Sequence, residues 1–325
     1  MSQAIFVNQT GGAQVLHLQD CEVGAPGRGE VLLKHTAIGV NYIDTYFRSG
    51  LYPSPNGLPF TPGNEAAGVV LAVGEGVEDV AVGQRVAYAG PLGAYSSERL
   101  IEARHLVAIP DRVSDEQAAA VMLKGMTAQY LLRQTYKVQQ DDWVLFHAAA
   151  GGVGLLLGQW AASLGANVIG TVSNPAKAEL ARQHGYAHII NYSEEDFVAR
   201  TAEITGGAKC HVVYDGVGAA TFPGSLDCLR PRGMFVSFGQ SSGPLPSFDL
   251  GLLAQKGSLF ATRPSLFAYT ATREALLACA GEMLEKVADS TLQICINQRF
   301  KLAEASQAHV ALEGRQTTGA TLLLP

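Results

Sequence analysis

A strand-like run, a turn of small residues and an apolar helix follow one another at 143–165, and this succession constrains the fold more than any other feature. Residues 143–146 read WVLF, 147–154 read HAAAGGVG and 155–165 read LLLGQWAASLG. The spacing Gly-x-Gly-x-x-Gly appears within the turn at 149–154, with alanine in the first position. In a dinucleotide-binding βαβ unit these positions serve the tight turn, the close approach of a pyrophosphate and the packing of helix on strand. The stretch predicts a dinucleotide-binding turn, and a purely structural turn is the alternative.

Five further apolar runs follow with the spacing of parallel strands that are joined by helices. Together with the run at 143–147, they predict strands at 167–172, 187–191, 211–215, 233–238 and 258–262. Alternation of strands and crossover helices is typical of an α/β protein with a parallel sheet. We therefore expect a doubly wound, six-stranded parallel sheet over residues 123–263.

The two flanking segments have a different texture. Residues 1–122 contain short β-like runs separated by Gly and Pro turns, which predicts a β-rich, barrel-like domain. Residues 264–325 contain one amphipathic helix, TREALLACAGEMLEKVA, and a final strand, ATLLLP. Because the six-stranded sheet is complete without this tail, we expect the tail to rejoin the first domain.

Amino-acid composition limits the cellular compartment and the classes of binding partner that we expect. The 325 residues carry a net charge of −6, without the basic stripe of a nucleic-acid-binding protein. No apolar run approaches the roughly 18 residues that cross a bilayer, and the start MSQAIFVNQTGG lacks the features of a signal peptide. The five cysteines are scattered, without CxxC or metal-ligand spacing. We expect a cytoplasmic protein that neither enters a membrane nor binds nucleic acid.

The second strand indicates which dinucleotide binds. An NAD site usually has an Asp or Glu about 20 residues after the glycines, which accepts from the ribose hydroxyl. Here the strand ends at Ser173 without an acid, and Asn174 and Pro175 open the next helix. Lys177 then lies in the first helical turn, where a cation opposes the helix dipole but suits a 2′-phosphate. We predict NADPH rather than NADH, with Tyr192 closing the adenosine pocket; a solvated surface lysine is the alternative for Lys177.

The remaining cofactor contacts follow from the ends of the strands. DGVG at 215–218 and FGQSSG at 238–243 end the fourth and fifth strands, and ligands of doubly wound sheets bind outside such carboxyl ends. The predicted contacts at the helix start and at these two strand ends are Gly151, Gly152, Val153, Gly216, Phe238, Gly239 and Ser241. We interpret His147 as a satisfied core histidine rather than a proton shuttle.

With these residues in view, the chain resembles the medium-chain dehydrogenase/reductases, and within them the zinc-free quinone oxidoreductase branch that includes zeta-crystallin. The motifs AIGVNYIDTYFRSGLYP, LKGMTAQYLL, HAAAGGVG and VSFGQSSG carry the resemblance, which covers essentially the whole chain. It implies a GroES-like catalytic domain that is formed from both chain ends, with the Rossmann domain inserted between them.

The resemblance also locates a metal site that this chain has lost. Where zinc-dependent relatives have Gly-His-Glu, the sequence reads GNEAAG, so Asn64 stands at the histidine position. Their cysteine ligand corresponds to a position near Asn41, and a later ligand to one near Leu123. Amide and alkyl side chains do not replace thiolate or imidazole on zinc, so we expect no metal. Reduction of a quinone gives a phenolate-like anion (phenol pKa about 10), which needs far less Lewis-acid help than an alkoxide.

By resemblance, the segment around Asn41 lines the cleft beside the nicotinamide. The predicted catalytic residues are Asn41, Tyr46 and Tyr52. A tyrosine hydroxyl there suits a hydrogen bond to the substrate carbonyl, and Asn41, with Ile43, suits the nicotinamide ribose or a water. Tyrosines that merely pack are the alternative, in which case catalysis is positioning only.

Two more predicted cofactor residues share one face of a helix, and a third comes from the resemblance. Thr127 and Tyr130 share a helix face that suits the nicotinamide end, or alternatively packing between domains. Arg315 in LEGRQTTG is implied as a second phosphate partner, with a surface arginine as the alternative.

The sequence predicts an NADPH:quinone oxidoreductase that works without metal on a small-molecule quinone. The alternative is an NADPH-dependent reductase of enones, which needs a proton donor for carbon. A non-enzymatic NADPH-binding or RNA-binding role is a third hypothesis. We also expect a homodimer through the last Rossmann strand, SLFAT at 258–262, because an apolar edge strand seeks a partner.

Overall fold

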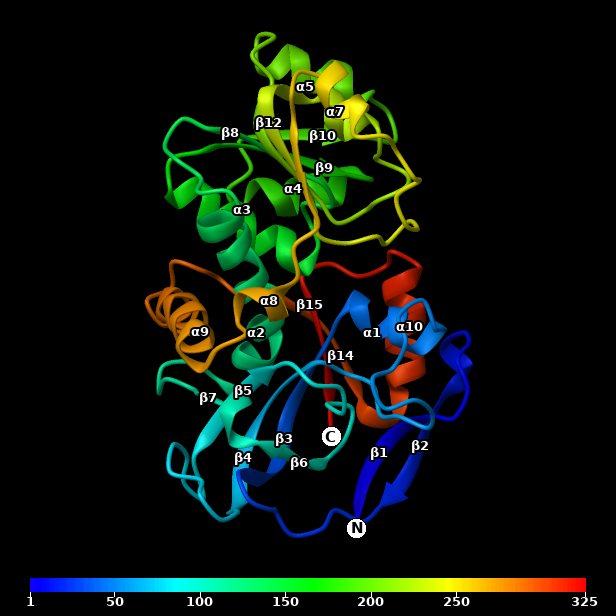
Figure 1. Ribbon diagram of the computed structural model, residues 1–325, viewed down its shortest axis with the longest axis vertical. Helices are drawn as coiled ribbons and strands as arrows, with labels where there is room; N and C mark the ends of the chain where they lie inside the picture. The colour runs from blue at the N-terminus through cyan, green and yellow to red at the C-terminus, as the bar shows by residue number, and fades with distance from the viewer. The chain divides into compact units, whose positions relative to one another are not determined.

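The computed structural model describes residues 1–325, and the chain divides into two compact units (Figure 1). The β-rich unit consists of Met1–Met126, Thr270–Ser290 and Ile294–Pro325. The α/β unit consists of Thr127–Tyr269 with the short segment Thr291–Gln293.

A seven-stranded sheet forms the centre of the β-rich unit. Its strand order is β14-β15-β3-β4-β5-β7, and β6 pairs with β3 outside this path. The strands are β3 (Glu30–Val40), β4 (Glu65–Val73), β5 (Arg85–Ala89), β6 (Glu98–Glu102), β7 (Val107–Ala108), β14 (Ile296–Lys301) and β15 (Ala320–Leu324). A separate antiparallel pair joins β1 (Ser2–Val7) to β2 (Leu16–Cys21).

The long strand β3 organises this sheet because it has different partners along its length. Its first part, 30–34, pairs with β6, and its last part, 38–40, pairs antiparallel with the C-terminal strand β15. Figure 1 shows the red strand β15 beside β14 in this sheet. The C-terminal strand β15 is therefore hydrogen-bonded to a strand of the N-terminal segment.

Helices α1 (Tyr42–Ser49), α9 (Arg273–Ala288) and α10 (Ala305–Glu313) complete the β-rich unit. Helix α9 coincides with the predicted amphipathic helix, and Thr272 caps it by accepting a hydrogen bond from the Ala275 N–H. Helix α2 (Asp115–Tyr130) continues across the boundary between the units as one chain segment.

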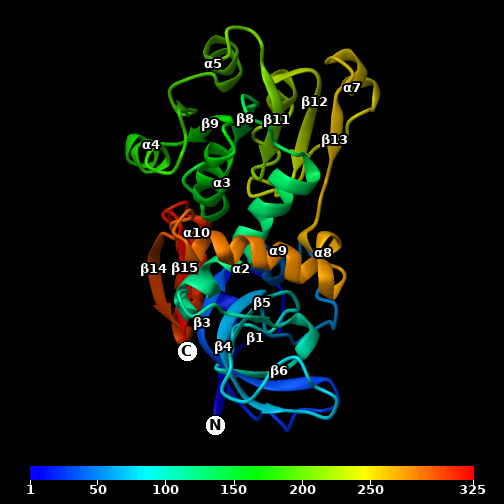
Figure 2. The ribbon, with the colours of Figure 1, turned by 90° about the vertical axis from the view of Figure 1, so that its left-hand side faces the viewer.

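The α/β unit contains a six-stranded parallel sheet in the order β10-β9-β8-β11-β12-β13. The strands are β8 (Trp143–Phe146), β9 (Asn167–Val172), β10 (His188–Asn191), β11 (Cys210–Asp215), β12 (Leu229–Ser237) and β13 (Phe260–Thr262). All six lie where the sequence predicts them, except that β12 begins four residues earlier and β13 two residues later. Figure 2 shows β13 at the edge of the sheet.

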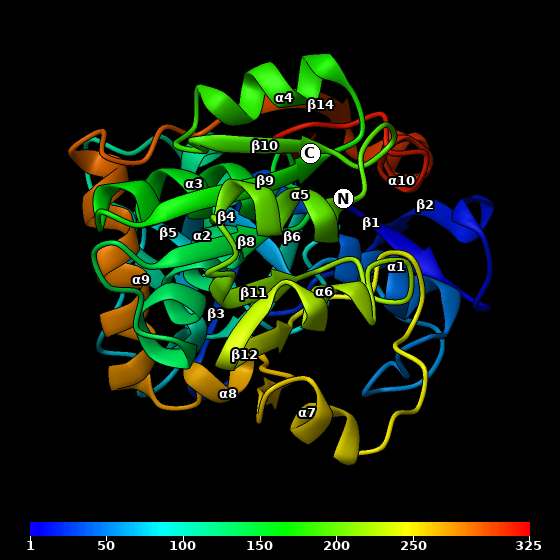
Figure 3. The same cartoon turned by 90° about the horizontal axis from the view of Figure 1, so that it is seen from above.

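Short helices connect these strands on both faces of the sheet. They are α3 (Gly152–Ser163), α4 (Pro175–Arg182), α5 (Phe197–Ile204) and α6 (Gly224–Asp227), followed by α7 (Gly251–Gln255) and α8 (Leu266–Tyr269). Helix α3 packs against α4, and α5 packs against α6, while α4 lies beside β10 (Figure 3). The predicted doubly wound architecture is confirmed.

Candidate functional site

The turn before α3 is built from backbone that leaves no room for larger side chains. Gly151 is the N-cap of α3 with an extended backbone and no capping side chain, and the first turn contains no acid. A Cβ on Gly154 would lie 2.4 Å from the Ala149 carbonyl oxygen and 2.7 Å from that of Ala148. A Cβ on Gly151 would meet only one atom, the Ala148 oxygen at 3.2 Å. An uncapped helix start without an acid in its first turn suits a phosphate group.

The alanine in the first fingerprint position is explained by the neighbouring residue. Ala148, and not Ala149, takes up the left-handed conformation of the turn, with φ of 62°. Ala149 is fully buried, and its N–H donates to the Thr171 carbonyl at 3.0 Å. A glycine is therefore not needed at 149.

His147 is fixed in a buried chain of hydrogen bonds at the ends of three strands. Its Nδ1 lies 3.0 Å from Thr171 Oγ1 and its Nε2 lies 3.0 Å from Ser225 Oγ. Ser225 Oγ in turn donates to Asp215 Oδ2 at 2.8 Å. Burial lowers the pKa of His147, so the ring is neutral. The interpretation of His147 as a satisfied core residue agrees with this environment.

Asp215 is a buried carboxylate whose two oxygens are both saturated with donors. Oδ1 accepts from the N–H groups of Val217 and Gly218, at 2.8 and 2.9 Å. Oδ2 accepts from the hydroxyls of Thr221 and Ser225, at 2.7 and 2.8 Å. This residue fixes the DGVG loop to the end of β11.

The two loops that end β11 and β12 pack on each other. A Cβ on Gly239 would lie 2.6 Å from the Gly216 oxygen, and Gly216 faces the Phe238 ring in the same way. The Ser241 N–H donates to the Gly216 carbonyl at 3.2 Å. The structure thus brings together Gly216, Phe238, Gly239 and Ser241, as the strand-end argument expects.

Arg263 is a further residue of this loop that the sequence reasoning missed. Its guanidinium donates to the carbonyl oxygens of Ser237 and Gly239, both at 2.9 Å. It directly follows β13, and a single arginine after a strand gives no sequence signal for such a contact.

The ends of β9 and β10 bring together the residues predicted around the adenosine. The Tyr192 N–H donates to the Val172 carbonyl at 3.1 Å, and the neighbouring Ser193 hydroxyl donates to the Ser173 carbonyl at 3.0 Å. Asn174 caps α4 by accepting from the backbone N–H of Lys177 at 2.9 Å. Lys177 is half-buried in a first turn that contains no acid.

Thr127 and Tyr130 are both buried in the last turns of α2. The Tyr130 ring stacks on the ring of Tyr269 with centroids 4.6 Å apart. Packing within the α/β unit therefore accounts for much of the environment of Tyr130.

In the β-rich unit, Glu65 gathers the positions that correspond to metal ligands in zinc-dependent relatives. This carboxylate is fully buried and accepts from Asn41 Nδ2 at 2.7 Å and from the Leu123 N–H at 2.7 Å. Lys124 Nζ lies 2.8 Å away and neutralises the charge. Asn64 is also buried, and its amide donates to the Gly90 carbonyl at 2.7 Å.

These contacts fix the amide of Asn41. Because Nδ2 faces the Glu65 carboxylate, the carbonyl oxygen of the Asn41 side chain faces the other way and is the acceptor that this residue presents. Nowhere in the chain do three or more His, Cys, Asp or Glu side chains gather in a way that suits a metal ion.

The predicted catalytic tyrosines lie in an aromatic cluster on and after α1. The rings of Tyr46 and Tyr52 meet edge to face with centroids 5.1 Å apart, and Tyr42 lies 5.6 Å from Tyr46. Tyr46 is buried, whereas Tyr52 and Ile43 are half-buried. The two tyrosines are brought together, and the packing alternative accounts for part of their surroundings.

Arg315 lies just beyond α10 in the β-rich unit, exposed and with a left-handed backbone of φ 57°. Its N–H donates to the Leu312 carbonyl at 3.1 Å. The predicted phosphate residues of the glycine turn belong to the other unit.

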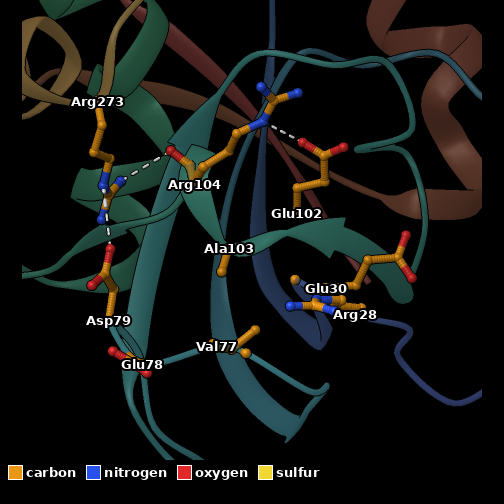
Figure 4. A pocket seen from close by; sticks show the side chains of 11 residues that line it. Arg28, Glu30, Val77, Glu78, Asp79, Glu102, Ala103, Arg104 and Arg273 are labelled. Atoms are coloured by element: carbon orange, nitrogen blue, oxygen red, sulfur yellow. Dashed lines mark hydrogen bonds and ion pairs between the residues drawn. The ribbon is translucent and has the colours of Figure 1, made fainter.

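A cavity of about 470 Å³ in the β-rich unit is a different feature (Figure 4). Its three arginines each meet a carboxylate, in the pairs Arg28–Glu75, Arg104–Glu102 and Arg273–Asp79. None of the predicted site residues lines it. This cavity is therefore separate from the predicted cofactor and substrate residues.

No helix in the structure combines the length and the apolar character that crossing a bilayer requires.

Comparison with known proteins identifies the family. Residues 27–139 match the family model of the alcohol dehydrogenase GroES-like domain, and residues 152–278 match that of the zinc-binding dehydrogenases. The chain is 54% identical to a quinone oxidoreductase of Pseudomonas aeruginosa, over the full length of both. It is 47% identical to a 2-haloacrylate reductase of a Burkholderia species, covering all of this chain and 99% of that one.

A solved structure agrees with these relatives. The quinone oxidoreductase of Escherichia coli in complex with NADPH matches with a TM-score of 0.98 and 48% identity, over 99% of this chain and all of that one. The resemblance seen in the sequence motifs is confirmed. The chain belongs to the medium-chain dehydrogenase/reductase superfamily and, within it, to the quinone oxidoreductase branch.

Proposed function

We propose that this protein is an NADPH:quinone oxidoreductase that works without a metal ion. The observation that carries the proposal is the environment of Glu65, whose carboxylate is occupied by Lys124 and Asn41. An ammonium, an amide and a backbone N–H are donors, and they saturate a carboxylate that elsewhere would be available to a cation. The full-length relatives named quinone oxidoreductase support the same activity.

The α/β unit fits the cofactor. We assign the pyrophosphate to Gly151, Gly152 and Val153, because the helix start is uncapped and a Cβ on Gly154 would collide with the turn. We assign the 2′-phosphate to Ser173 and Lys177, and the adenine to Tyr192, because the ends of β9 and β10 lie side by side and the first turn of α4 contains no acid.

The remaining contacts of the cofactor are proposed on the loops after β11 and β12, on the end of α2 and on the β-rich unit. They are Gly216, Phe238, Gly239, Ser241, Thr127, Tyr130, Asn41, Ile43 and Arg315. The related Escherichia coli structure, which is a complex with NADPH, supports the choice of cofactor.

When bound, NADPH supplies a hydride. Asn41 presents a carbonyl oxygen toward the ribose or a water, because Glu65 holds its amide nitrogen. Tyr46 and Tyr52 orient the substrate carbonyl. Addition of one hydride and one proton converts a quinone to a hydroquinone, and solvent supplies the proton, since the intermediate anion is no more basic than a phenolate, with pKa about 10. The contribution of the protein is positioning and electrostatic.

Oxidation of NADPH measured against a panel of quinones, enones, aldehydes and alcohols tests this proposal. We expect quinones to be the best acceptors and alcohols with NADP⁺ to give no reaction. Activity confined to alcohols, or stoichiometric zinc in the purified protein, contradicts it.

Reduction of activated C=C bonds is the second candidate, and the 2-haloacrylate reductase relative favours it. Such a reaction needs a proton on carbon. If Tyr46 or Tyr52 supplies it, replacement of both by Phe reduces turnover of enones by about 100-fold and changes that of benzoquinone little. Equal effects on both acceptors argue for a packing role of the two rings.

We further propose a cytoplasmic homodimer that pairs through β13. Phe260 on this edge strand is 58% exposed, and exposed apolar edges associate. Sedimentation should give a dimer at micromolar concentration, and a monomer contradicts this interface.

With a net charge of −6, we expect no RNA binding. Tight binding of RNA in a filter assay, with displacement by NADPH, contradicts that expectation.

A further inference from the structure

A chain of buried polar side chains in the β-rich unit leads from the surface to the proposed site. Exposed Glu313 forms a two-pronged ion pair with the buried Arg48, with both distances 2.8 Å. Arg48 Nη1 lies 3.3 Å from His309 Nδ1, and His309 Nε2 lies 2.9 Å from the Tyr95 hydroxyl. The Tyr95 hydroxyl lies 3.0 Å from Asp44 Oδ2.

The chemistry of these groups fixes the direction of every hydrogen bond. A guanidinium only donates, so His309 Nδ1 accepts and the proton of the ring lies on Nε2. Nε2–H then donates to the oxygen of Tyr95, and the hydroxyl proton of Tyr95 is left to donate to Asp44. Burial and the charge of Arg48 lower the pKa of His309 to about 3, in agreement with a neutral ring.

Asp44 receives two donors on one oxygen and none on the other. Oδ2 accepts from Tyr95 and from the backbone N–H of Asn41, the latter at 2.8 Å. Oδ1 is buried without a hydrogen-bond partner, and the residue has no exposed surface. A buried, unpartnered carboxylate oxygen is costly when charged, and protonation removes the charge.

The surroundings of Asp44 also favour the neutral acid. Lys124 favours its charge, but Lys124 is paired with Glu65, whose own charge opposes that of Asp44. Burial dominates and raises the pKa of Asp44 to about 7. Asn64 adds a second buried acceptor without a partner, and its neighbour Gly63 packs on the Tyr95 ring. Asp44 Oδ1 and Asn64 Oδ1 are thus both buried without a donor, and a proton on Asp44 Oδ1 removes the charge from the first of them.

We propose that Asp44 works as a neutral carboxylic acid with its proton on Oδ1, and that His309 and Tyr95 are positioning residues that hold it against Asn41. Asp44 fixes the backbone of Asn41 where α1 begins, while Glu65 fixes its side chain. The C-terminal helix α10 thereby positions a residue of the nicotinamide site. This inference rests on the role of Asn41 in the proposed function.

Spectroscopy on the whole protein tests the protonation states without reference to activity. In protein with isotope-labelled histidine, the NMR signal that is absent from His309→Gln should report a neutral ring protonated on Nε2 between about pH 5 and pH 8. Infrared spectra at about pH 6 should contain a protonated-carboxyl band that Asp44→Asn lacks. A charged His309, the opposite tautomer, or no difference in the carboxyl band overturns the proposal.

Binding of NADPH tests the positioning role. In Asp44→Asn the side-chain carbonyl oxygen still accepts from the Tyr95 hydroxyl and the Asn41 N–H, and an amide N–H takes the place of the acid O–H. Asp44→Asn should therefore change the Kd of NADPH less than about threefold. Asp44→Ala and Tyr95→Phe should each raise it about tenfold. The matched control is Tyr88→Phe, which removes another fully buried hydroxyl, 3.0 Å from His35 Nε2, that has no bond to Asp44. Tyr88→Phe should leave the Kd unchanged.

The pH dependence separates this proposal from the proposed function. The Kd of the wild type should rise above about pH 7, where Asp44 ionises, and that of Asp44→Asn should not. Equal weakening by Asp44→Asn and Asp44→Ala contradicts the neutral acid. If no variant changes NADPH binding while the spectra show the protonated acid, Asn41 has no role at the nicotinamide and the positioning claim fails. Failure of quinone turnover in wild-type protein that still binds NADPH tightly contradicts the proposed function instead.

Discussion

Two buried aspartates, one in each unit, have similar neighbours but differ in the number of hydrogen-bond donors that their carboxyl oxygens receive. In the α/β unit a neutral His147 contacts the Ser225 hydroxyl, which donates to Asp215 Oδ2. In the β-rich unit His309 contacts the Tyr95 hydroxyl, which donates to Asp44. Neither aspartate has exposed surface.

The difference lies in the second oxygen. Both oxygens of Asp215 are saturated, two of the donors being backbone N–H groups of the loop that it fixes. Asp44 keeps one oxygen without any partner. A buried carboxylate is therefore a rigid anchor where donors surround it, and a neutral acid where they are missing. Burial alone does not distinguish the two.

The largest effect expected from this comparison is on stability as a function of pH. Burial raises the pKa of Asp44 from 3.8 to about 7, so the folded protein keeps a proton that the unfolded chain releases. Stability from this residue is complete below about pH 4 and is lost as the pH rises to about 7, by about 4 kcal/mol. The free energies of unfolding of wild type and Asp44→Asn, measured with urea, should differ increasingly from about pH 4 to about pH 7. Above about pH 7 the difference should stay constant. A difference independent of pH means that Asp44 is ionised throughout.

The same substitution should have opposite consequences at the two aspartates. Asp215→Asn turns an acceptor of two hydroxyl donors into a donor, and leaving buried groups unpaired should cost about 3 kcal/mol of unfolding free energy. Asp44→Asn should instead raise the unfolding free energy by about 4 kcal/mol at about pH 7, because wild-type Asp44 has by then lost the stability of its neutral form. Denaturant unfolding of both variants at that pH measures the contrast, and equal losses remove the distinction between anchor and acid.

Much of the fold was predictable because the information is local. The apolar runs of the parallel strands and the caps Asn174 and Thr272 act on residues within a few positions of themselves. The same holds for the small residues of the glycine turn, although the left-handed residue is Ala148 and the helix cap is Gly151.

The buried polar chains were not predictable. Asp44 and Tyr95 lie 51 residues apart, and Tyr95 and His309 lie 214 apart. No spacing rule joins such residues, because the sheet brings them together. The direction of each hydrogen bond depends on which neighbouring group can only donate, and these neighbours are known only from the folded structure.

A third experiment tests how rigid the glycine turn before α3 in the α/β unit is. Gly154→Ala places a Cβ against the backbone oxygens of Ala148 and Ala149, which directly follow His147, so it should cost about 2 kcal/mol of stability and weaken NADPH binding. The matched control is Gly281→Ala in α9, where a Cβ meets nothing within 4 Å. This control should stabilise by about 0.5–1 kcal/mol. If Gly154→Ala is tolerated as well as the control, the turn is not rigid.

The smallest expected effect is on the choice of cofactor. Lys177→Ala should raise the Kd of NADPH about tenfold, equivalent to about 1.4 kcal/mol, and leave that of NADH unchanged. Fluorescence titration with both nucleotides measures the contrast. Lys137→Ala, at an exposed lysine before β8, is the control and should affect neither. Equal losses for both nucleotides would place Lys177 away from the 2′-phosphate.

The most direct test of the proposed activity is the rate of quinone-dependent NADPH oxidation by purified protein before and after treatment with a zinc chelator. The residues at the former ligand positions, Asn41, Asn64 and Leu123, give a chelator nothing to remove. We therefore predict the same rate in both samples, with NADPH strongly preferred to NADH. Loss of activity on chelation, restored by added zinc, would contradict the account.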